Sequence, residues 1–503
     1  MSTGAAAAPA APTPTGLPAS AEVEAESAPR PAGGSVARNA SLLAVATILA
    51  RVATFGSAIV MARGLGVASY GRYGFAAALA TVIVPFADLG LTPYLGREIA
   101  RARSGSDALA TRLARVKLGL TAGVGLVSAL AVLLLDDGTL AAAILVVLAG
   151  LLADSVCQFV YGYFRGGERM GFEARATVVA ALARALGAIA LVLAFGLLMP
   201  VLAWMLAVSA SQLAFAGRRF RRTIGPAARE RPAAGSVAWR SVGAMGMITL
   251  FGMVYLRADS IIAGSILDQR NVGWYTSAYT LVSGLQIVPW MIAVAFSPVF
   301  ARSHEKDPAL FRSSWNAGLR AVLLLSMPCA LVTCLLAGPI VALCFGAAFH
   351  PATTALAVLV WSTPVWALNM TVSVAIRGTG RESWLAWVTG GGVVLNLGLN
   401  FWAISVWGIV GAAAVTVITE GAVFLVLTAL GISHGIVPWP SLAYWRMLLA
   451  LAVLAAVALA VSGWPVVLGL IVSLAAYLAV LGLTRVLGRE DLATVASVAR
   501  RGG

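Results

Sequence analysis

Two opposite charges, Arg257 and Asp259, interrupt the apolar stretch VYLRADSIIAG at positions 254–264. A charge at the centre of a lipid bilayer costs about 3 kcal/mol even on insertion scales, so such side chains face protein or a watery cavity. Residues two apart on a helix point about 200° away from each other, so each charge needs its own partner. Five more charges lie in apolar segments: Arg51, Asp88, Asp154, Arg184 and Glu420.

Arginine suits the recognition of phosphate groups, because its guanidinium stays charged and presents a planar fork of donors. Arg51 and Arg257 each lie near the middle of an apolar segment. We therefore expect these two residues to bind an anionic headgroup such as a diphosphate. Arg184 lies nearer to a membrane surface, towards which its long side chain can extend, and is a third candidate for substrate binding.

The acidic residues in the apolar segments are candidates for ion coupling. A carboxyl group in such a site can exchange a proton or hold a cation. The alternative is that the four acids and three arginines neutralise one another as structural ion pairs. The four acids are Asp88, Asp154, Asp259 and Glu420.

The four cysteines show no metal-type spacing and no disulfide framework. All of them fall in or beside apolar segments. We expect no metal site, no cofactor and no catalytic residue. The cysteines are Cys157, Cys329, Cys334 and Cys344.

The two halves of the sequence carry an internal repeat. The repeat makes Arg51 and Arg257 approximate equivalents, because they precede the first pair of matched motifs by 16 and 15 residues. Pro85 and Pro289 are also matched, and a proline inside a helix bends it, so both are candidate hinges. The matched motifs are VASYG at 67–71 with VGWYT at 272–276, Ile-Val-Pro at 83–85 and 287–289, and RGGER at 165–169 with RGTGR at 377–381.

The composition predicts a polytopic helical membrane protein. Hydrophobic residues make up 60% of the chain and charged residues only 11%, whereas soluble proteins carry roughly 25% charged residues. Apolar blocks of about twenty residues match the thickness of a bilayer. The ninth block could break near Gly338-Pro339. Fourteen spans are predicted, at 39–61, 73–95, 118–135, 140–163, 177–199, 201–217, 241–266, 273–300, 318–345, 352–375, 384–406, 408–431, 444–462 and 465–485.

The distribution of basic residues predicts the orientation. With the N-terminus inside, 29 of the 35 Lys and Arg residues fall on the cytoplasmic side, as the positive-inside rule requires. Both termini are therefore expected in the cytoplasm. The net charge of +15 then reflects topology and attraction to anionic lipid headgroups rather than nucleic-acid binding. The run RRFRR at 218–222 is the strongest case.

The repeat is offset by six spans, so the two halves share one orientation and are related by an axis along the membrane normal. This predicts two pseudo-symmetric six-helix lobes around a central cavity, plus two extra C-terminal helices. The expected parts are a disordered cytoplasmic tail (1–37), an N-lobe (38–217), a basic cytoplasmic linker (218–240), a C-lobe (241–432), the extra helices (444–485) and a cytoplasmic tail (486–503).

Several segments resemble the bacterial polysaccharide and O-antigen flippases, which belong to the multidrug/oligosaccharidyl-lipid/polysaccharide exporter superfamily. The first carries the Leu-Gly and Tyr-Gly loop and the Arg97-Glu98 pair typical of those flippases. The resemblance covers about 39–485. The similar segments are ARGLGVASYGRYGFAAALATVIVPFADLGLTPYLGREIAR at 62–101, RGGERMGFEARATV at 165–178, LRADSIIAGSILDQRNVGWYTSAY at 256–279 and RGTGRESWLAW at 377–387.

The resemblance implies a transporter, not an enzyme, in the bacterial plasma membrane. It implies movement of a polyprenyl-diphosphate-linked oligosaccharide between leaflets by ion-coupled alternating access. Membrane lipids are expected contacts, glycan-assembly proteins are candidate partners, and the functional unit is expected to be a monomer. Three alternatives remain: a drug or cation antiporter of the same superfamily, a membrane glycosyltransferase or glycan polymerase, and a non-transporting scaffold. An enzyme would need exposed acid or base groups, and only Asp136-Asp137 offers an outer acidic pair.

Overall fold

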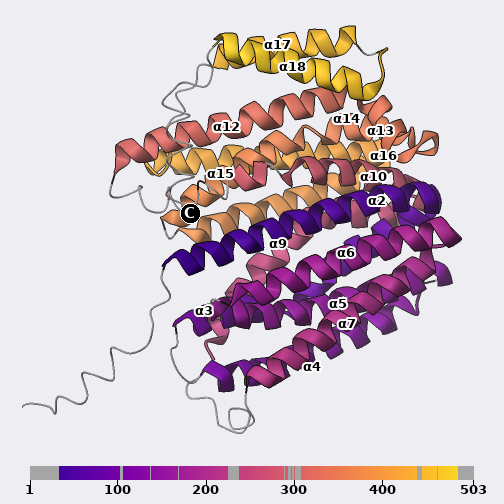
Figure 1. The fold of residues 1–503 in the computed structure, drawn as a ribbon, viewed down its shortest axis with the longest axis vertical. Helices are drawn as coiled ribbons and strands as arrows, with labels where there is room; N and C mark the ends of the chain where they lie inside the picture. The colour runs from indigo at the N-terminus through magenta and orange to yellow at the C-terminus, as the bar shows by residue number, and fades with distance from the viewer. Residues whose placement is uncertain are drawn as a thin grey trace, which may run out of the picture.

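The computed structural model describes residues 33–101, 106–135, 137–167, 169–224, 237–287, 289–292, 296, 300, 307–379, 381–438, 444–461 and 463–484. Within these ranges every regular element is a helix. Most of the helices run side by side along one direction (Figure 1). The all-α membrane fold expected from the composition is thereby confirmed.

The N-terminal half begins with the long helix α2 (Gly33–Ile83), which is bent at Gly66. The 3₁₀ helix η1 (Val84–Ala87) follows it directly. Five further helices complete this half: α3 (Leu91–Arg101), α4 (Ser106–Val132), α5 (Gly138–Gly166), α6 (Met170–Phe195) and α7 (Leu198–Thr223).

The C-terminal half also contains a long helix that is bent at a glycine. Its last long helix, α16 (Glu382–Ser433), is bent at Gly408 as α2 is bent at Gly66. The preceding elements are α9 (Trp239–Ile266), α10 (Gln269–Leu285), α12 (Pro308–Leu335), α13 (Ala337–Phe345), η2 (Ala347–Phe349), α14 (Ala352–Leu359) and α15 (Ser362–Gly378), and the chain continues into α17 (Tyr444–Ala460) and α18 (Val466–Thr484).

The described helices agree with about fourteen spans. Ten helical segments are long and apolar enough to cross a membrane. Two of them, Val45–Ala87 and Ser383–Ser433, are double spans of 43 and 51 residues. The shorter helices α10 and α17 supply the remaining two spans.

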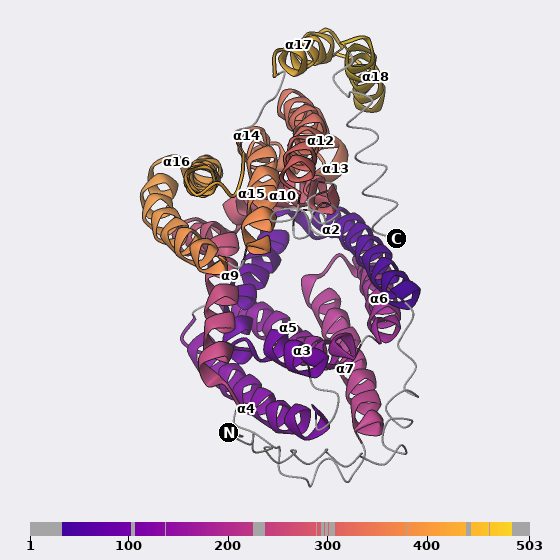
Figure 2. The ribbon, with the colours of Figure 1, turned by 90° about the vertical axis from the view of Figure 1, so that its left-hand side faces the viewer.

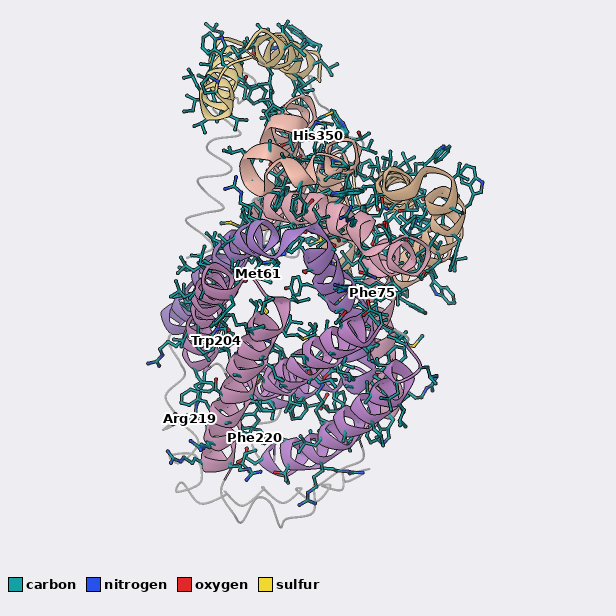
Figure 3. The ribbon with its side chains drawn as sticks, turned by 90° about the vertical axis from the view of Figure 1, so that its right-hand side faces the viewer. Met61, Phe75, Trp204, Arg219, Phe220 and His350 are labelled. Atoms are coloured by element: carbon teal, nitrogen blue, oxygen red, sulfur yellow. The ribbon has the colours of Figure 1, made fainter. Side chains whose placement is uncertain are left out.

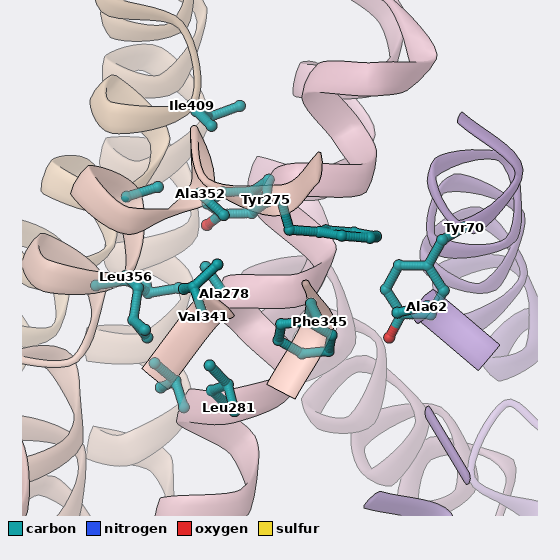
Figure 4. Close-up of a cluster of buried hydrophobic side chains, with 14 of the residues drawn as sticks. Ala62, Tyr70, Tyr275, Ala278, Leu281, Val341, Phe345, Ala352, Leu356 and Ile409 are labelled. Atoms are coloured by element: carbon teal, nitrogen blue, oxygen red, sulfur yellow. The ribbon is translucent and has the colours of Figure 1, made fainter. Parts of the chain in front are cut away.

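The helices form two lobes and a separate pair. Figure 2 shows α2–α7 together in one group, α9–α16 in a second, and the α17–α18 pair beyond the second. The lobes meet where α2 packs against α9 and α10. The largest apolar cluster lies at this junction and joins Ala62 and Tyr70 of α2 to Tyr275 of α10 and Phe345 of α13 (Figure 4).

The helix pair α17–α18 packs on the second lobe through α12. Tyr477 on α18 is buried and donates a 2.9 Å hydrogen bond to the Leu324 carbonyl oxygen on α12. Ala450 and Leu454 on α17 pack against Val332 and Leu336 in the same contact. The pair therefore lies on the outside of the C-terminal half.

Two predicted spans differ from the structure at prolines. The spans at 73–95 and 273–300 are not continuous helices bent at proline. The helix α2 ends at Ile83, and Pro85 is the second residue of η1. The helix α10 ends at Leu285, and the chain is helical again at Ile287 and Pro289 after a turn at Gln286. Proline lacks an N–H and clashes with the carbonyl four residues earlier, so each helix is interrupted ahead of its proline. The predicted break of the ninth span near Gly338-Pro339 is confirmed, because α12 ends at Leu335 and α13 begins at Ala337.

Two segment boundaries also shift. The helix α2 begins at Gly33, so the start of the first helix includes the end of the expected tail. The helix α7 extends to Thr223, so RRFRR is helical and does not belong to a linker. Residues 1–32, 225–236 and 486–503 lie outside the described part of the chain.

Candidate functional site

A cavity of about 390 Å³ lies between the two lobes, and both Arg51 and Arg257 line it. Residues of α2 and α6 form one side, and residues of α9 and α10 form the other. The lining positions on α2 include Thr47, Arg51 and Thr54, whose spacing of three and four residues places them on one helix face. The cavity therefore brings together the two arginines that the repeat makes equivalent.

The two guanidinium groups are held in similar ways. Arg51 lies over the Trp290 ring with 5.2 Å from its Cζ atom to the ring centroid, and Arg257 lies over the Tyr279 ring at 4.9 Å. Across the described residues, neither side chain makes an ion pair. A cation stacked on a ring face keeps its N–H edges available. Both arginines thus keep a net positive charge at the cavity wall.

The rest of the cavity wall is rich in hydroxyl groups and contains no carboxylate among its described residues. Tyr70 on α2 and Thr280 on α10 share a 3.0 Å hydrogen bond across the lobes. Thr54 donates to the Ala50 carbonyl oxygen, which leaves its oxygen free to accept a hydrogen bond. The wall therefore combines two positive charges with neutral donors and acceptors, a composition that suits an anionic, hydroxylated ligand.

Arg184, the third arginine, belongs to a different arrangement. Its Nη2 atom lies 2.6 Å from Asp154 Oδ1 and also donates to Ser209 Oγ and Gln212 Oε1, each at 3.0 Å. It does not line the cavity between the lobes. The structure thus joins Arg184 on α6 to Asp154 on α5 as an ion pair inside the N-lobe.

Asp88 is paired with a residue that the sequence placed in a loop, Lys117. The Lys117 side chain is 0% exposed, and its ammonium lies 2.9 Å from Asp88 Oδ1 and 2.6 Å from Ser155 Oγ. Thr92 donates to the same carboxylate through its hydroxyl and its N–H. This cluster fastens α4 and α5 to the interruption between η1 and α3.

Asp259 and Glu420 line a second, much smaller cavity in the C-lobe, of about 30 Å³. They are 3% and 7% exposed. Asp259 accepts hydrogen bonds from Tyr275, Ser260 and Thr416. Neither carboxylate forms an ion pair with a described residue.

Glu420 is held by an amide instead of a cation. Asn369 Nδ2 donates to Glu420 Oε2 at 2.6 Å and to its carbonyl oxygen at 3.0 Å. Asn396 and Thr419, joined by a 3.1 Å hydrogen bond, line the same small cavity. The cavity therefore has two acidic groups and several neutral oxygens, which is a donor set suited to a proton or a hard monovalent cation.

Some residues of these sites were not predicted from the sequence. Lys117 directly precedes the predicted span 118–135, so the sequence places it in the segment on the cytoplasmic side. Tyr275 and Tyr279 stand four residues apart, so that both project to one side of α10. The available signal was two tyrosines on one face of α10. It becomes informative only once it is known that α10 packs beside the charged residues of α9.

Comparison with known proteins shows where the chain belongs. The family model described as "Polysaccharide biosynthesis protein" matches residues 36–304, which is more than half of the chain. The model described as MatE matches residues 244–402. No curated protein sequence matches.

Solved structures share the fold. A lipid II flippase, MurJ, in an inward closed conformation aligns with a TM-score of 0.72 at 13% identity, covering 88% of this chain and 98% of that one. An inward-facing multidrug resistance MATE transporter of the MOP superfamily aligns with a TM-score of 0.63 at 18% identity, covering 76% and 94%.

A third structure, a MOP superfamily transporter from Pyrococcus furiosus whose title reports a reversed polarity of the binding pocket, has a TM-score of 0.58 at 15% identity and covers 80% and 95%. The chain therefore has the flippase and transporter fold of the MOP superfamily, and it belongs to the polysaccharide biosynthesis protein family.

Proposed function

We propose that this protein moves a polyprenyl-diphosphate-linked oligosaccharide from the inner to the outer leaflet of the bacterial plasma membrane. The observation that carries the proposal is the pair of repeat-related arginines in one cavity between the lobes, without an acidic residue among the described lining residues. Membership in the polysaccharide biosynthesis protein family supports a glycan substrate.

The cavity chemistry fits a diphosphate carrying sugars. Arg51 and Arg257 supply one positive charge each from opposite lobes, and a guanidinium fork binds phosphate oxygens in pairs. The hydroxyl groups of Thr47, Tyr73 and Ser283 on the same wall can exchange hydrogen bonds with sugar hydroxyls. The apolar lipid tail stays in the bilayer, because its transfer into a polar cavity would be unfavourable.

The contacts between the lobes support access from the predicted inner side. Arg63 Nη2 on α2 donates to the Leu343 carbonyl oxygen on α13 at 2.7 Å. A side chain added at Gly71 would collide with the backbone at Gln269. These residues lie at the end of the bundle predicted to face outward, so the lobes are in tight contact there. Transport then requires these contacts to separate as the inner end closes.

The moving parts of this cycle would turn at the helix interruptions near Pro85 and Pro289. Both interruptions lie at the same place in the repeat, directly after α2 and α10. Hinges commonly use helix ends, where a few residues absorb changes in φ and ψ. The protein is proposed to act as a monomer with both termini in the cytoplasm.

We propose that Asp259 and Glu420 couple the cycle to an ion. Their cavity holds about 30 Å³, enough for a single small occupant. By contrast, Asp88 and Asp154 are neutralised by Lys117 and Arg184, so we assign these two acids a structural role. Arg184 is assigned the same role, since its charge is directed at Asp154.

A drug or cation antiporter is the second candidate, favoured by the MatE match and the MATE-like structures. A cationic drug would meet two positive charges and no described carboxylate in the central cavity, so the wall polarity argues against it.

A glycan polymerase has less support. Asp137 begins α5 as its N-cap, and hydrogen bonds from Thr139 and Leu140 lower the pKa of its carboxyl, whereas a general acid needs a raised pKa. Its neighbour Asp136 lies outside the described residues.

The test is translocation in proteoliposomes. One assay supplies a fluorescent polyprenyl-diphosphate oligosaccharide, and a parallel assay supplies a cationic dye as a representative drug substrate. The proposal predicts ion-gradient-dependent movement of the glycolipid and no dye transport. Dye transport without movement of any lipid-linked glycan would assign the protein to the antiporters instead.

A further inference from the structure

A second large cavity, of about 680 Å³, lies in the N-lobe away from the central cavity. Residues of α4, α5 and α7 line it. The helix α5 contacts both α4 and α7, and Figure 2 shows α4 and α7 as two separate arms at the lower end of this lobe. The cavity is thus a crevice between two helices with α5 as its floor.

The crevice is apolar in its deeper part and basic towards the predicted inner end. Its floor consists of Val156, Phe159 and Val160, all buried. Leu118 lies on α4 about 5 Å deeper than Arg115, and Leu213 lies on α7 about 7 Å deeper than Arg218, at a rise of 1.5 Å per residue. The polarity therefore changes along the membrane normal.

The basic rim is formed by arginines of both arms. Arg115 on α4 and Arg218 and Arg221 on α7 line the cavity, and all three are exposed. Arg115 and Arg218 make no ion pair with another described residue. Lys117 also borders the cavity, but its ammonium is turned to Asp88 and Ser155 and does not add to the rim.

We propose that this crevice binds an anionic phospholipid of the inner leaflet, with its phosphate between Arg115 and Arg218 and an acyl chain along the apolar floor. Basic pockets between membrane helices on the cytoplasmic side suit lipid phosphates. The deeper, apolar part of the crevice can bind an acyl chain, which a free phosphate ion lacks. The site is separate from the cavity proposed for the transported glycolipid, and its failure would leave that proposal untouched.

The same two helices offer matched controls. Arg112 on α4 and Arg219 on α7 are exposed arginines that do not line the crevice. Figure 3 shows Arg219 and Phe220 together near one end of α7, with Trp204 further along that helix. The variant Arg112→Gln/Arg219→Gln therefore removes the same charge from the same arms without touching the rim.

The floor can be tested without changing any charge. A Cβ atom at Gly217, which lines the crevice, would meet no atom within 4 Å, so Gly217→Trp adds bulk at the crevice from a position where the side chain can begin without a clash. Gly123→Trp on α4 is the control, because Gly123 has equal room and lies outside the crevice.

The experiment measures binding of phosphatidylglycerol to the full-length purified protein by native mass spectrometry, with phosphatidylcholine and inorganic phosphate as comparisons. Melting temperature in detergent confirms that each variant is folded. We expect Arg115→Gln/Arg218→Gln to weaken phosphatidylglycerol binding about twenty-fivefold, since each arginine near a lipid phosphate contributes roughly a factor of five. Gly217→Trp should weaken it at least tenfold, and both control variants should bind as the wild type does.

Three results would overturn the proposal. Equal weakening by the Arg112/Arg219 pair would mean general attraction of a basic surface. Competition by inorganic phosphate at equal concentration would mean that the crevice is a simple anion site, to which the lipid acyl chain contributes nothing. Unchanged binding in both Arg115→Gln/Arg218→Gln and Gly217→Trp would place the lipid elsewhere.

Discussion

Arg257 and Asp259 stand two residues apart on α9, yet they line different cavities. Arg257 lies on the wall of the cavity between the lobes, over the Tyr279 ring. Asp259 lies on the wall of the small C-lobe cavity, where Tyr275 donates to it. Tyr275 and Tyr279 lie on successive turns of α10. The helices α9 and α10 together therefore separate a positively charged site from a negatively charged one.

This separation predicts that substitutions at the two positions affect different properties. Asp259→Asn removes the charge at nearly unchanged size and keeps one acceptor oxygen, for either Tyr275 or Ser260. Transport should therefore become independent of the ion gradient while headgroup binding stays within about twofold. The measurement compares initial rates with and without a gradient. A gradient response equal to that of the wild type in Asp259→Asn would exclude this residue from coupling.

The buried pair of Lys117 and Asp88 predicts that removing one partner lowers the stability strongly and that removing the second partner as well restores part of it. Lys117→Leu leaves the Asp88 carboxylate without its cation, and breaking a buried pair costs about 3 kcal/mol. The double variant Lys117→Leu/Asp88→Asn removes both charges and should recover at least half of that loss. Unfolding in detergent, followed for both single variants and the double variant, measures the coupling. Additive losses would contradict a direct pair.

The bend in α2 predicts opposite effects at two glycines of the same helix. Gly66 has φ of +78° and ψ of 168°, a conformation close to glycine-only, so Gly66→Ala should destabilise by about 1–3 kcal/mol. Gly56 lies in regular helix, where alanine is favoured by up to about 1 kcal/mol. A Cβ atom meets no neighbour within 4 Å at either position, so packing does not bias the comparison. Equal melting temperatures would show that α2 is not bent at Gly66.

The start of α10 predicts a pH dependence. Asp268 is its N-cap and accepts from the Asn271 N–H at 2.8 Å, which lowers the pKa of this exposed carboxyl below 3.8. The stabilisation is present at neutral pH and is lost as the pH falls through the lowered value. Asp268→Ala should therefore melt earlier than the wild type at pH 7, with the gap narrowing below about pH 4. A gap that stays constant down to pH 3 would argue against a charged cap.

The sequence was sufficient to predict the class of fold, because apolar blocks as long as a bilayer is thick are compatible with membrane-spanning helices and with few other structures. The repeat makes Arg51 and Arg257 equivalent, and in the structure both line one cavity. The proline rule predicts bends at Pro85 and Pro289, but it does not say whether a helix continues through the proline or is interrupted just before it, as α2 and α10 are at Ile83 and Leu285. The partners of Asp88 and Asp154 came from other helices, Lys117 and Arg184, and sequence distance holds no information on such contacts.

The Arg257→Ala variant tests the role of the cavity arginines most directly, through its rate of translocation. Arg240, an exposed arginine of the same helix that does not line the cavity, provides the control as Arg240→Ala. In proteoliposomes supplied with a polyprenyl-diphosphate oligosaccharide, Arg257→Ala should translocate at least tenfold more slowly than Arg240→Ala, with both variants folded. Equal rates for the two variants would contradict the assignment of this cavity as the headgroup site.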